Sequence, residues 1–523
     1  MAGEEAVSAL AARPGRGGRA AARGPVARRA AALFLLLVVV YSFSIGLRAS
    51  RGAAITGDEP FYLLTTQSLV EDGDLDLRQQ YRRQSYRSFF DHPEGLWMQS
   101  VPTPDGRILS PHNPGLSVLL IPGFALAGLR GAQAELLLLA ALAFALTYLW
   151  VARVTGEAAW SWWATLAVAA GATPFVYATE IYPEVPAALA LVAALLLLPA
   201  GGATGAGAVG PCVAAAGAGQ DAGTAQASGR PGACGSGRTR GPAHAVGPGR
   251  ALALAMLLAA MLWLGIKYAP LAALVAGAAF LRGNRRARAV LVVAAAVLGA
   301  VYVAFHLRVF GALTPYTVNV VYAGDSTPVV LRQHVTDLAT RFYRLWGLFV
   351  DRRFGVARWA PVLFLALPGW AWLARRPGTP RLALALILAQ HLMATFVAIT
   401  MMGWWFPGRT LMTVLPLYAL PLAAVLQRGG RGVRGLFAGL AVLSAFITAD
   451  LARAVYAGQV TVAVDPFAMP AALFQGMGPF FPDYRAWTPA TTALTVAWLA
   501  VLLGGLAWGG RLAGRGRLVD AAD

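Results

Sequence analysis

Two adjacent carboxylates, Asp58 and Glu59, stand in the stretch I-T-G-D-E-P-F-Y-L, directly after the first long apolar run of the chain. A carboxylate within hydrogen-bond reach of a hydroxyl can accept its proton as that hydroxyl attacks a substrate. The same residues also suit a helix start, because Thr56-x-x-Glu59 has capping-box spacing and Pro60 fits a first turn. The pair therefore leaves two interpretations open, a general base and a helix cap.

A second group of polar residues stands where other long apolar runs are interrupted. It comprises His112, the stretch E-I-Y-P-E at 180–184, Lys267 in G-I-K-Y-A-P, and Arg409 in G-W-W-F-P-G-R. Guanidinium and ammonium groups can stabilise the charge of a phosphate, and arginine does so with two parallel hydrogen bonds. Charged groups at membrane depth are costly, so they indicate function by default. These residues predict a site for a phosphate-bearing lipid and a polar acceptor.

The composition indicates that a membrane positions these residues. Of the 523 residues, 58% are hydrophobic and only 13% are charged, whereas soluble domains carry about 25% charged residues. Apolar runs of about 20 residues, long enough to cross the hydrocarbon core, recur along the chain. We therefore predict an all-α polytopic membrane protein with about twelve transmembrane helices. We also expect a large first outer loop that carries interfacial helices.

The net charge of +19 would suit nucleic-acid binding. However, the arginines cluster in short segments between apolar runs, which is typical of cytoplasmic loops of membrane proteins. We therefore expect the lipid bilayer and no nucleic acid as a partner. The two cysteines, Cys212 and Cys234, form neither a disulfide framework nor a metal-ligand spacing. No metal and no other cofactor is expected.

The arginine clusters also predict the domain organisation, with both termini in the cytoplasm. Residues 1–30 form a basic cytoplasmic tail, and residues 511–523 form a second one. Residues 31–200 form an N-terminal transmembrane module whose outer loop, 49–131, carries the candidate catalytic pair. A disordered Gly/Ala-rich cytoplasmic loop at 201–250 separates it from a C-terminal module at 251–510. The outer loops of the second module are 311–358 and 456–487.

The apolar runs predict where the individual helices lie. The segment 113–128 is short and interrupted by Pro and Gly, which indicates a re-entrant or interfacial helix. The run 251–281 has arginines at both ends, which predicts a helical hairpin whose tip is G-I-K-Y-A-P. Single spans are predicted at 31–48, 132–152, 158–178, 185–200, 289–310, 359–374, 382–401, 410–427, 435–455 and 488–509.

Several segments resemble a known family. D-E-P-F-Y after the first span is similar to the first outer loop of integral membrane glycosyltransferases of the C-type fold. The resemblance is to the branch with protein O-mannosyltransferases and bacterial aminoarabinose transferases. Segments 56–77, 105–128, 348–363 and 404–416 agree in order. The sequence departs from the family in two places: Asn113-Pro114-Gly115 lacks a double proline, and Pro407-Gly408 inverts the usual order.

The resemblance implies an enzyme of the cytoplasmic membrane that acts on its outer face. It would transfer a sugar from a polyprenyl-phosphate-linked donor, with inversion, to a cell-envelope glycan, a lipid-linked saccharide or a protein. Asp58 would be the base, and Glu59 would bind the acceptor, shift the pKa of Asp58, or cap the helix. The donor phosphate would bind Arg409, Lys267 and His112. The acceptor and sugar would contact Tyr62, Glu180, Tyr182, Glu184 and Trp405.

Other interpretations of the same residues stay open. Arg409 and Lys267 could anchor at the headgroup level, the aromatic residues could form an interfacial belt, and Glu180 and Glu184 could be solvated loop acids. At the level of the whole chain, the alternatives are a transporter or flippase of lipid-linked saccharides and an inactive scaffold of cell-wall assembly. A transporter often shows internal repeats and polar residues at mid-membrane, and the sequence shows neither pattern.

Overall fold

The structure is a computed structural model that describes residues 16–199, 245–316, 318, 338–398, 400–401 and 405–519. Half of the predicted N-terminal tail (1–15), most of the loop at 201–250 (201–244) and part of the outer loop at 311–358 (317 and 319–337) lie outside these residues. The described end of the predicted loop, 245–250, already includes the first residues of α9 (Pro248–Leu264). The described residues form helices packed side by side and contain no strand. This confirms the predicted all-α fold.

Six helices among the described residues are long and apolar enough to cross a membrane. This finding confirms a polytopic membrane architecture. They lie in α1 (Arg16–Ser42), α5 (Ile121–Thr155), α11 (Arg285–Phe310), α18 (Thr379–Leu392) with the π turn η6 (Met393–Val397), α20 (Arg431–Tyr456) and α22 (Pro489–Val519).

Shorter helices in series form the other predicted spans. They are α6 (Ala158–Ala169) with α7 (Ala172–Tyr177), α8 (Glu184–Leu197), η5 (Pro361–Leu365) with α17 (Ala366–Arg375), and η8 (Leu415–Tyr418) with α19 (Ala419–Arg428). The prediction of one continuous helix over 158–178 is wrong. Pro174 has no N–H for the carbonyl of Ala170, so the helix breaks there. The Thr448 hydroxyl donates to the Ala170 carbonyl instead, at 2.8 Å.

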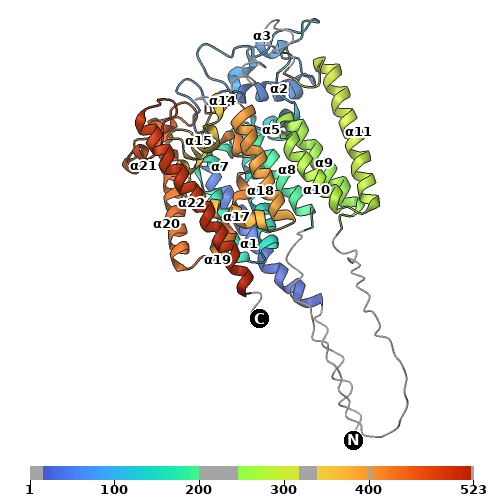
Figure 1. Ribbon diagram of the computed structural model, residues 1–523. Coiled ribbons are helices and arrows are strands. Elements are labelled where there is room, and N and C mark those ends of the chain that lie inside the picture. Colours follow the sequence, from blue (N-terminus) through green and yellow to red (C-terminus); the bar gives the residue numbers. More distant parts are fainter. Residues whose placement is uncertain are drawn as a thin grey trace, which may run out of the picture.

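The segment predicted as a helical hairpin folds as one. It consists of α9 (Pro248–Leu264), the 3-10 turn η4 (Ile266–Tyr268) and α10 (Ala269–Arg282), which lie side by side in Figure 1. At the base of the hairpin, the N–H of Val246 donates to the carbonyl of Arg282 at 3.1 Å. The tip therefore carries Lys267 to the end of the hairpin that faces the first outer loop.

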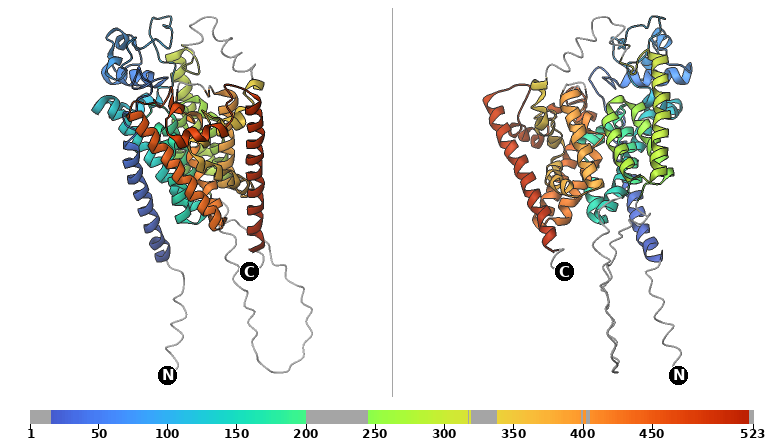
Figure 2. Two further views of the ribbon diagram at one scale, coloured as in Figure 1. Left: turned by 90° about the vertical axis from the view of Figure 1, so that its left-hand side faces the viewer. Right: turned by 45° about the vertical axis from the view of Figure 1, so that its right-hand side comes forward.

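The first outer loop gathers at one end of the helical body. It contains α2 (Glu59–Glu71), α3 (Arg78–Arg82), the 3-10 turn η2 (Ser85–Ser88) and α4 (Gly115–Leu119). The described start of α1 and the described end of α22 lie at the opposite end of the body (Figure 2). The remaining short elements are α14 (Leu338–Arg341), α15 (Arg344–Val350), α16 (Val356–Trp359), η7 (Arg409–Leu411), η9 (Pro466–Ala468), α21 (Ala472–Met477) and η10 (Gly478–Phe480).

The predicted interfacial segment, 113–128, consists of α4 and the first turns of α5. The helix that follows is broken at Ala127 and Gly128, where Gly128 has a φ of +55°. The segment folds back closely on the span, because a Cβ on Gly131 would lie 1.8 Å from the carbonyl oxygen of Gly123. The two pieces of α5 therefore act as separate helices, as the sequence predicted.

Glycine also allows α4 to approach the tip of the hairpin. A Cβ on Gly115 would lie 2.4 Å from the carbonyl oxygen of Trp263 in α9. Next to it, the Asn113 side-chain amide donates to the hydroxyl of Tyr302 in α11, at 3.1 Å. The Asn-Pro-Gly sequence, which departs from the family pattern, thus joins the outer loop to the element that carries Lys267.

Replacing Gly115 with alanine should lower the unfolding temperature of the detergent-solubilised protein, because the added Cβ has no room. Overpacking of this kind costs about 1–3 kcal/mol. Gly277→Ala in α10 is the matched control, since a Cβ there would meet no atom within 4 Å. Equal unfolding temperatures for the two variants would contradict the close contact between α4 and the hairpin.

Candidate active site

Four charged side chains from distant segments meet beside the first outer loop. The Arg409 Nη2 donates to Asp58 Oδ2 at 2.8 Å, and its Nε donates to Glu184 Oε1 at 3.2 Å. The Lys267 Nζ donates to the same Glu184 oxygen at 2.7 Å. The sequence predicted all four residues as site residues, and the fold brings them into one hydrogen-bonded cluster, which we name the Arg409 cluster.

Gly408 forms the turn that places the Arg409 side chain in the cluster. Gly408 has a φ of +89°, and a Cβ on it would lie 2.7 Å from Val356 and 2.8 Å from Thr173. The segment before it is fixed by hydrogen bonds from the Thr173 hydroxyl to the Pro407 carbonyl, at 3.0 Å, and from the Tyr177 hydroxyl to the Phe406 carbonyl, at 2.6 Å. The order Pro-Gly-Arg, which departs from the family pattern, is therefore the order that this turn requires.

Aromatic rings hold the guanidinium of Arg409. Its central carbon lies 3.8 Å from the ring centroid of Tyr182 and 4.8 Å from that of Trp405. Such cation–π contacts gain strength when they are removed from water, as here, where the Arg409 side chain is only 8% exposed. The sequence placed both rings at the site as sugar contacts; in the structure they contact the arginine. The burial of Arg409 argues against a headgroup anchor.

Glu184 and Lys267 differ in exposure. The Glu184 side chain is 1% exposed and accepts hydrogen bonds from both cations, so it is not a solvated loop acid. The Lys267 side chain is 39% exposed, so Lys267 is the more open of the two residues. The two residues therefore form a buried carboxylate with a reachable cation beside it.

Asp58 is the most accessible carboxylate of the Arg409 cluster, with a side chain that is 23% exposed. Burial opposes its ionisation, but the charge of Arg409, the hydrogen bond from Arg409 and the other nearby cationic groups together outweigh burial and hold the pKa of Asp58 below its usual range. Its second oxygen, Oδ1, accepts a hydrogen bond from the Gln99 amide at 3.3 Å. The sequence did not identify Gln99, because a lone glutamine in a loop carries no spacing signal.

His112 lies behind Asp58 and is fixed by Gln99 and Tyr62. The Nε2 of His112 lies 2.8 Å from Gln99 Oε1 and 3.8 Å from Asp58 Oδ1, and the imidazole stacks on the Tyr62 ring at 4.7 Å. Burial lowers the pKa of His112 to about 4, although Asp58 acts in the opposite direction. His112 is therefore neutral near pH 7.

Glu59 faces away from the Arg409 cluster. Its Oε2 accepts the N–H of Thr56 at 2.9 Å, and its Oε1 accepts the N–H of Ile181 at 2.9 Å. The first bond is one half of the predicted capping box. The second joins the start of the outer loop to the turn before α8, where the Tyr182 hydroxyl also donates to the Thr56 carbonyl at 3.3 Å. The contacts of Glu59 thus fit the cap interpretation, whereas Asp58 faces Arg409 and its role as a base stays a prediction.

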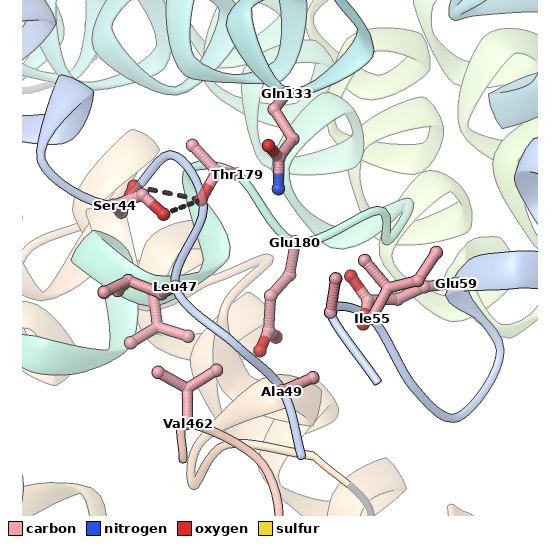
Figure 3. Close-up of a pocket in the computed structure, with 11 residues that line it drawn as sticks. Ser44, Leu47, Ala49, Ile55, Glu59, Gln133, Thr179, Glu180 and Val462 are labelled. Atoms are coloured by element: carbon pink, nitrogen blue, oxygen red, sulfur yellow. Dashed lines mark hydrogen bonds between the residues drawn. The ribbon is translucent and has the colours of Figure 1, made fainter. Parts of the chain in front are cut away.

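Glu180 is also separate from the Arg409 cluster. It is 7% exposed, and its carboxyl extends into a small cavity beside Glu59, with Ser44 and Thr179 on the opposite wall (Figure 3). Its Oε2 has no hydrogen-bond partner among the described residues. Burial and the neighbouring Glu59 raise the pKa of Glu180 well above its ordinary value. The predicted contact between Glu180 and an acceptor has no direct support in this geometry.

The described residues contain no group of three or more His, Cys, Asp or Glu side chains that could hold a metal ion. Trp404, which the sequence grouped with Trp405, lies outside the described residues. The expectation that the protein works without a metal cofactor stays a prediction.

No protein-family model and no curated protein matches the chain. Among solved structures, the chain is similar to the crystal structure of ArnT from Cupriavidus metallidurans bound to undecaprenyl phosphate, at 14% sequence identity and a TM-score of 0.44. The match covers 92% of this chain and 74% of that one. A likeness at this level of identity and TM-score carries no argument about the family or the function of this chain.

Replacing Glu59 with aspartate should destabilise the protein, because the shorter side chain cannot reach both Thr56 and Ile181. A buried N–H that loses its partner costs about 1–3 kcal/mol. Thermal unfolding in detergent measures the effect, and Glu94→Asp in the exposed part of the same loop is the matched control. A Glu59→Asp variant as stable as the control would exclude the bridging role.

The low pKa of His112 predicts a loss of stability in acid. The folded-state pKa of about 4 lies below the ordinary histidine pKa of about 6.5, so this contribution to stability is present above pH 6.5 and is lost as the pH falls toward 4. Between about pH 7.5 and pH 5, wild type should lose about 2 kcal/mol more than His112→Gln. Denaturant titrations at several pH values measure this difference, and parallel profiles for the two proteins would contradict it.

Proposed function

We propose that the protein is an integral membrane glycosyltransferase. It transfers a sugar from a polyprenyl-phosphate-linked donor to a hydroxyl-bearing acceptor outside the cytoplasmic membrane. The observation that carries this proposal is the Arg409 cluster, in which a reachable carboxylate, Asp58, lies beside two cations, Arg409 and Lys267. The described start of α1 and the described end of α22 lie at the end of the helical body opposite the first outer loop. This arrangement supports cytoplasmic termini and an extracytoplasmic site.

The cations suit the donor. A sugar linked to a lipid phosphate leaves when the bond between its anomeric carbon and the phosphate oxygen breaks, and the electron pair stays on that oxygen. Arg409 and Lys267 can stabilise this growing charge without any proton transfer. Lys267 is the more exposed cation, so the lipid phosphate contacts it first. The buried Arg409 then fixes the orientation of the phosphate by hydrogen bonds along the edge of the guanidinium.

Asp58 suits the acceptor. The acceptor oxygen forms a bond to the anomeric carbon while its proton passes to the Asp58 carboxylate. The acceptor attacks from the face opposite the departing phosphate, so a single displacement inverts the configuration. The acceptor can be a cell-envelope glycan, a lipid-linked saccharide or a protein, since each supplies a hydroxyl.

The aromatic residues around Asp58 are suited to bind a sugar. Three aromatic rings lie close together next to Asp58. The ring centroid of Phe61 lies 5.6 Å from that of Trp97 and 6.4 Å from that of His112. Trp97 is 52% exposed and is open to a ligand on one side. Rings of this kind stack on the apolar faces of sugars, and polar neighbours bind the hydroxyls. Tyr62 supports this group through its contact with His112, whereas Tyr182 and Trp405 contact Arg409.

Replacing Asp58 with asparagine should reduce sugar transfer by about 10²–10⁴-fold, the usual contribution of a general base. Membranes with wild-type or variant protein at matched levels would be given labelled polyprenyl-phosphate sugars and cell-envelope extract. Asp105→Asn is the matched control, because Asp105 lies in the same outer loop with a side chain that is 57% exposed. Equal transfer by Asp58→Asn and wild type would remove Asp58 from the mechanism. Transfer by none of the proteins, with any donor, would count against the proposed function.

A further inference from the structure

The Arg409 cluster is balanced in charge without any ligand. Asp58 and Glu184 supply two negative charges, and Arg409 and Lys267 supply two positive ones. Three groups that contact it, Tyr62, Tyr182 and His112, are neutral near pH 7. A lipid phosphate would add a negative charge that no remaining cation among the described residues of the cluster compensates. Such a charge is costly away from water.

The geometry of Arg409 restricts how an anion can approach. Aromatic rings lie close to the guanidinium at Tyr182 and Trp405, so hydrogen bonds to it run along its edge. Two of its five N–H donors are occupied, Nε by Glu184 and Nη2 by Asp58. Both carboxylates therefore bind the edge formed by Nε and Nη2, and a phosphate that binds this edge with the two parallel bonds that arginine favours competes with them.

Asp58 is the carboxylate that can be displaced from Arg409. Glu184 is 1% exposed and is held by Lys267 as well as by Arg409, whereas the Asp58 side chain is 23% exposed and has one bond to the arginine. The main chain of Asp58 stays in place as the N-cap of α2, where its carbonyl accepts from Phe61 and Tyr62. Only the side chain of Asp58 needs to change its partner.

We propose that the donor phosphate displaces Asp58 from Arg409, so that the carboxylate becomes available as a base only when the donor is bound. This inference rests on the proposed function. Without a donor, the Asp58–Arg409 ion pair holds Oδ2 against Arg409 and makes the carboxylate a weaker base. With a donor, Arg409 turns its Nη2 to the phosphate and Oδ2 is released.

Gln99 keeps the released carboxylate of Asp58 in position. Its amide holds Oδ1 of Asp58 at 3.3 Å and is itself oriented by His112 at 2.8 Å. Asp58 therefore keeps one fixed oxygen while the other becomes free to accept a proton. The bound phosphate also offsets the charge of Arg409, the largest of the charges that lower the pKa of Asp58, and the carboxylate thereby becomes a stronger base. In this arrangement the donor binds before the acceptor is deprotonated.

A double-mutant cycle on ligand affinity tests the proposal. Purified wild type, Asp58→Asn, Arg409→Gln and the double variant would be titrated with polyprenyl phosphate in detergent. Asp58→Asn should bind about tenfold more tightly than wild type, because Arg409 no longer has to be released. In the Arg409→Gln background, the same substitution should change the affinity by less than about twofold. Asp105→Asn, which removes an exposed acid, should leave the affinity unchanged.

An equal gain in both backgrounds would mean that Asp58 acts only through its general negative field, and this result would overturn the proposal. No gain in the wild-type background would overturn it too. Binding by wild type would leave the proposed function standing in either case, whereas no binding by any variant would count against both.

A second measurement uses the wild-type protein, so it does not depend on whether Arg409→Gln folds. A structure with bound polyprenyl phosphate should show the phosphate within hydrogen-bond distance of Arg409 and Asp58 Oδ2 separated from Arg409 Nη2. An intact Asp58–Arg409 ion pair in that complex would overturn the proposal.

Discussion

The burial of one arginine is the constraint on which the rest of the structure depends. A guanidinium with 8% of its side chain exposed is stable only if its charge and its donors are matched. Asp58 and Glu184 supply the match, and both stand at helix starts, Asp58 as the N-cap of α2 and Glu184 as the first residue of α8. Negative charge is favourable at that end of a helix. The helices therefore stabilise the acids, and the acids stabilise the arginine.

Two glycines and a proline bring these segments together. Gly408 lets the chain turn into Arg409 against α7, and Gly115 lets α4 dock on the hairpin that carries Lys267. Pro174 breaks the helix before α7, which places the turn at 180–184 beside the outer loop. The two glycines act because they have no Cβ, and the proline acts because it has no backbone N–H. Their effect is to hold polar groups rigidly at the end of an otherwise apolar bundle.

The sequence predicted the members of the Arg409 cluster for a physical reason. Charged residues are scarce in this chain, so Asp58, Glu184, Lys267 and Arg409 stand out wherever an apolar run is interrupted. The hairpin at 251–281 was predictable because arginines flank it on both sides. Gln99 was not predictable, since its role depends only on which loop residues meet in space. The break near Ala170 was missed because a Pro inside an apolar run does not by itself tell a kink from a new helix.

The sequence also left open whether the adjacent pair Asp58 and Glu59 forms a base or a cap, and the structure gives each residue different partners. Successive residues at a helix start point in different directions, so one acid faces Arg409 while the next faces the backbone of Thr56 and Ile181. The two arrangements depend on each other. Glu59 fixes the loop that presents Asp58 and the turn that leads to Glu184, so the carboxylates of the Arg409 cluster keep their spacing. A single acid at this position could satisfy either the backbone or the arginine, but it could not do both.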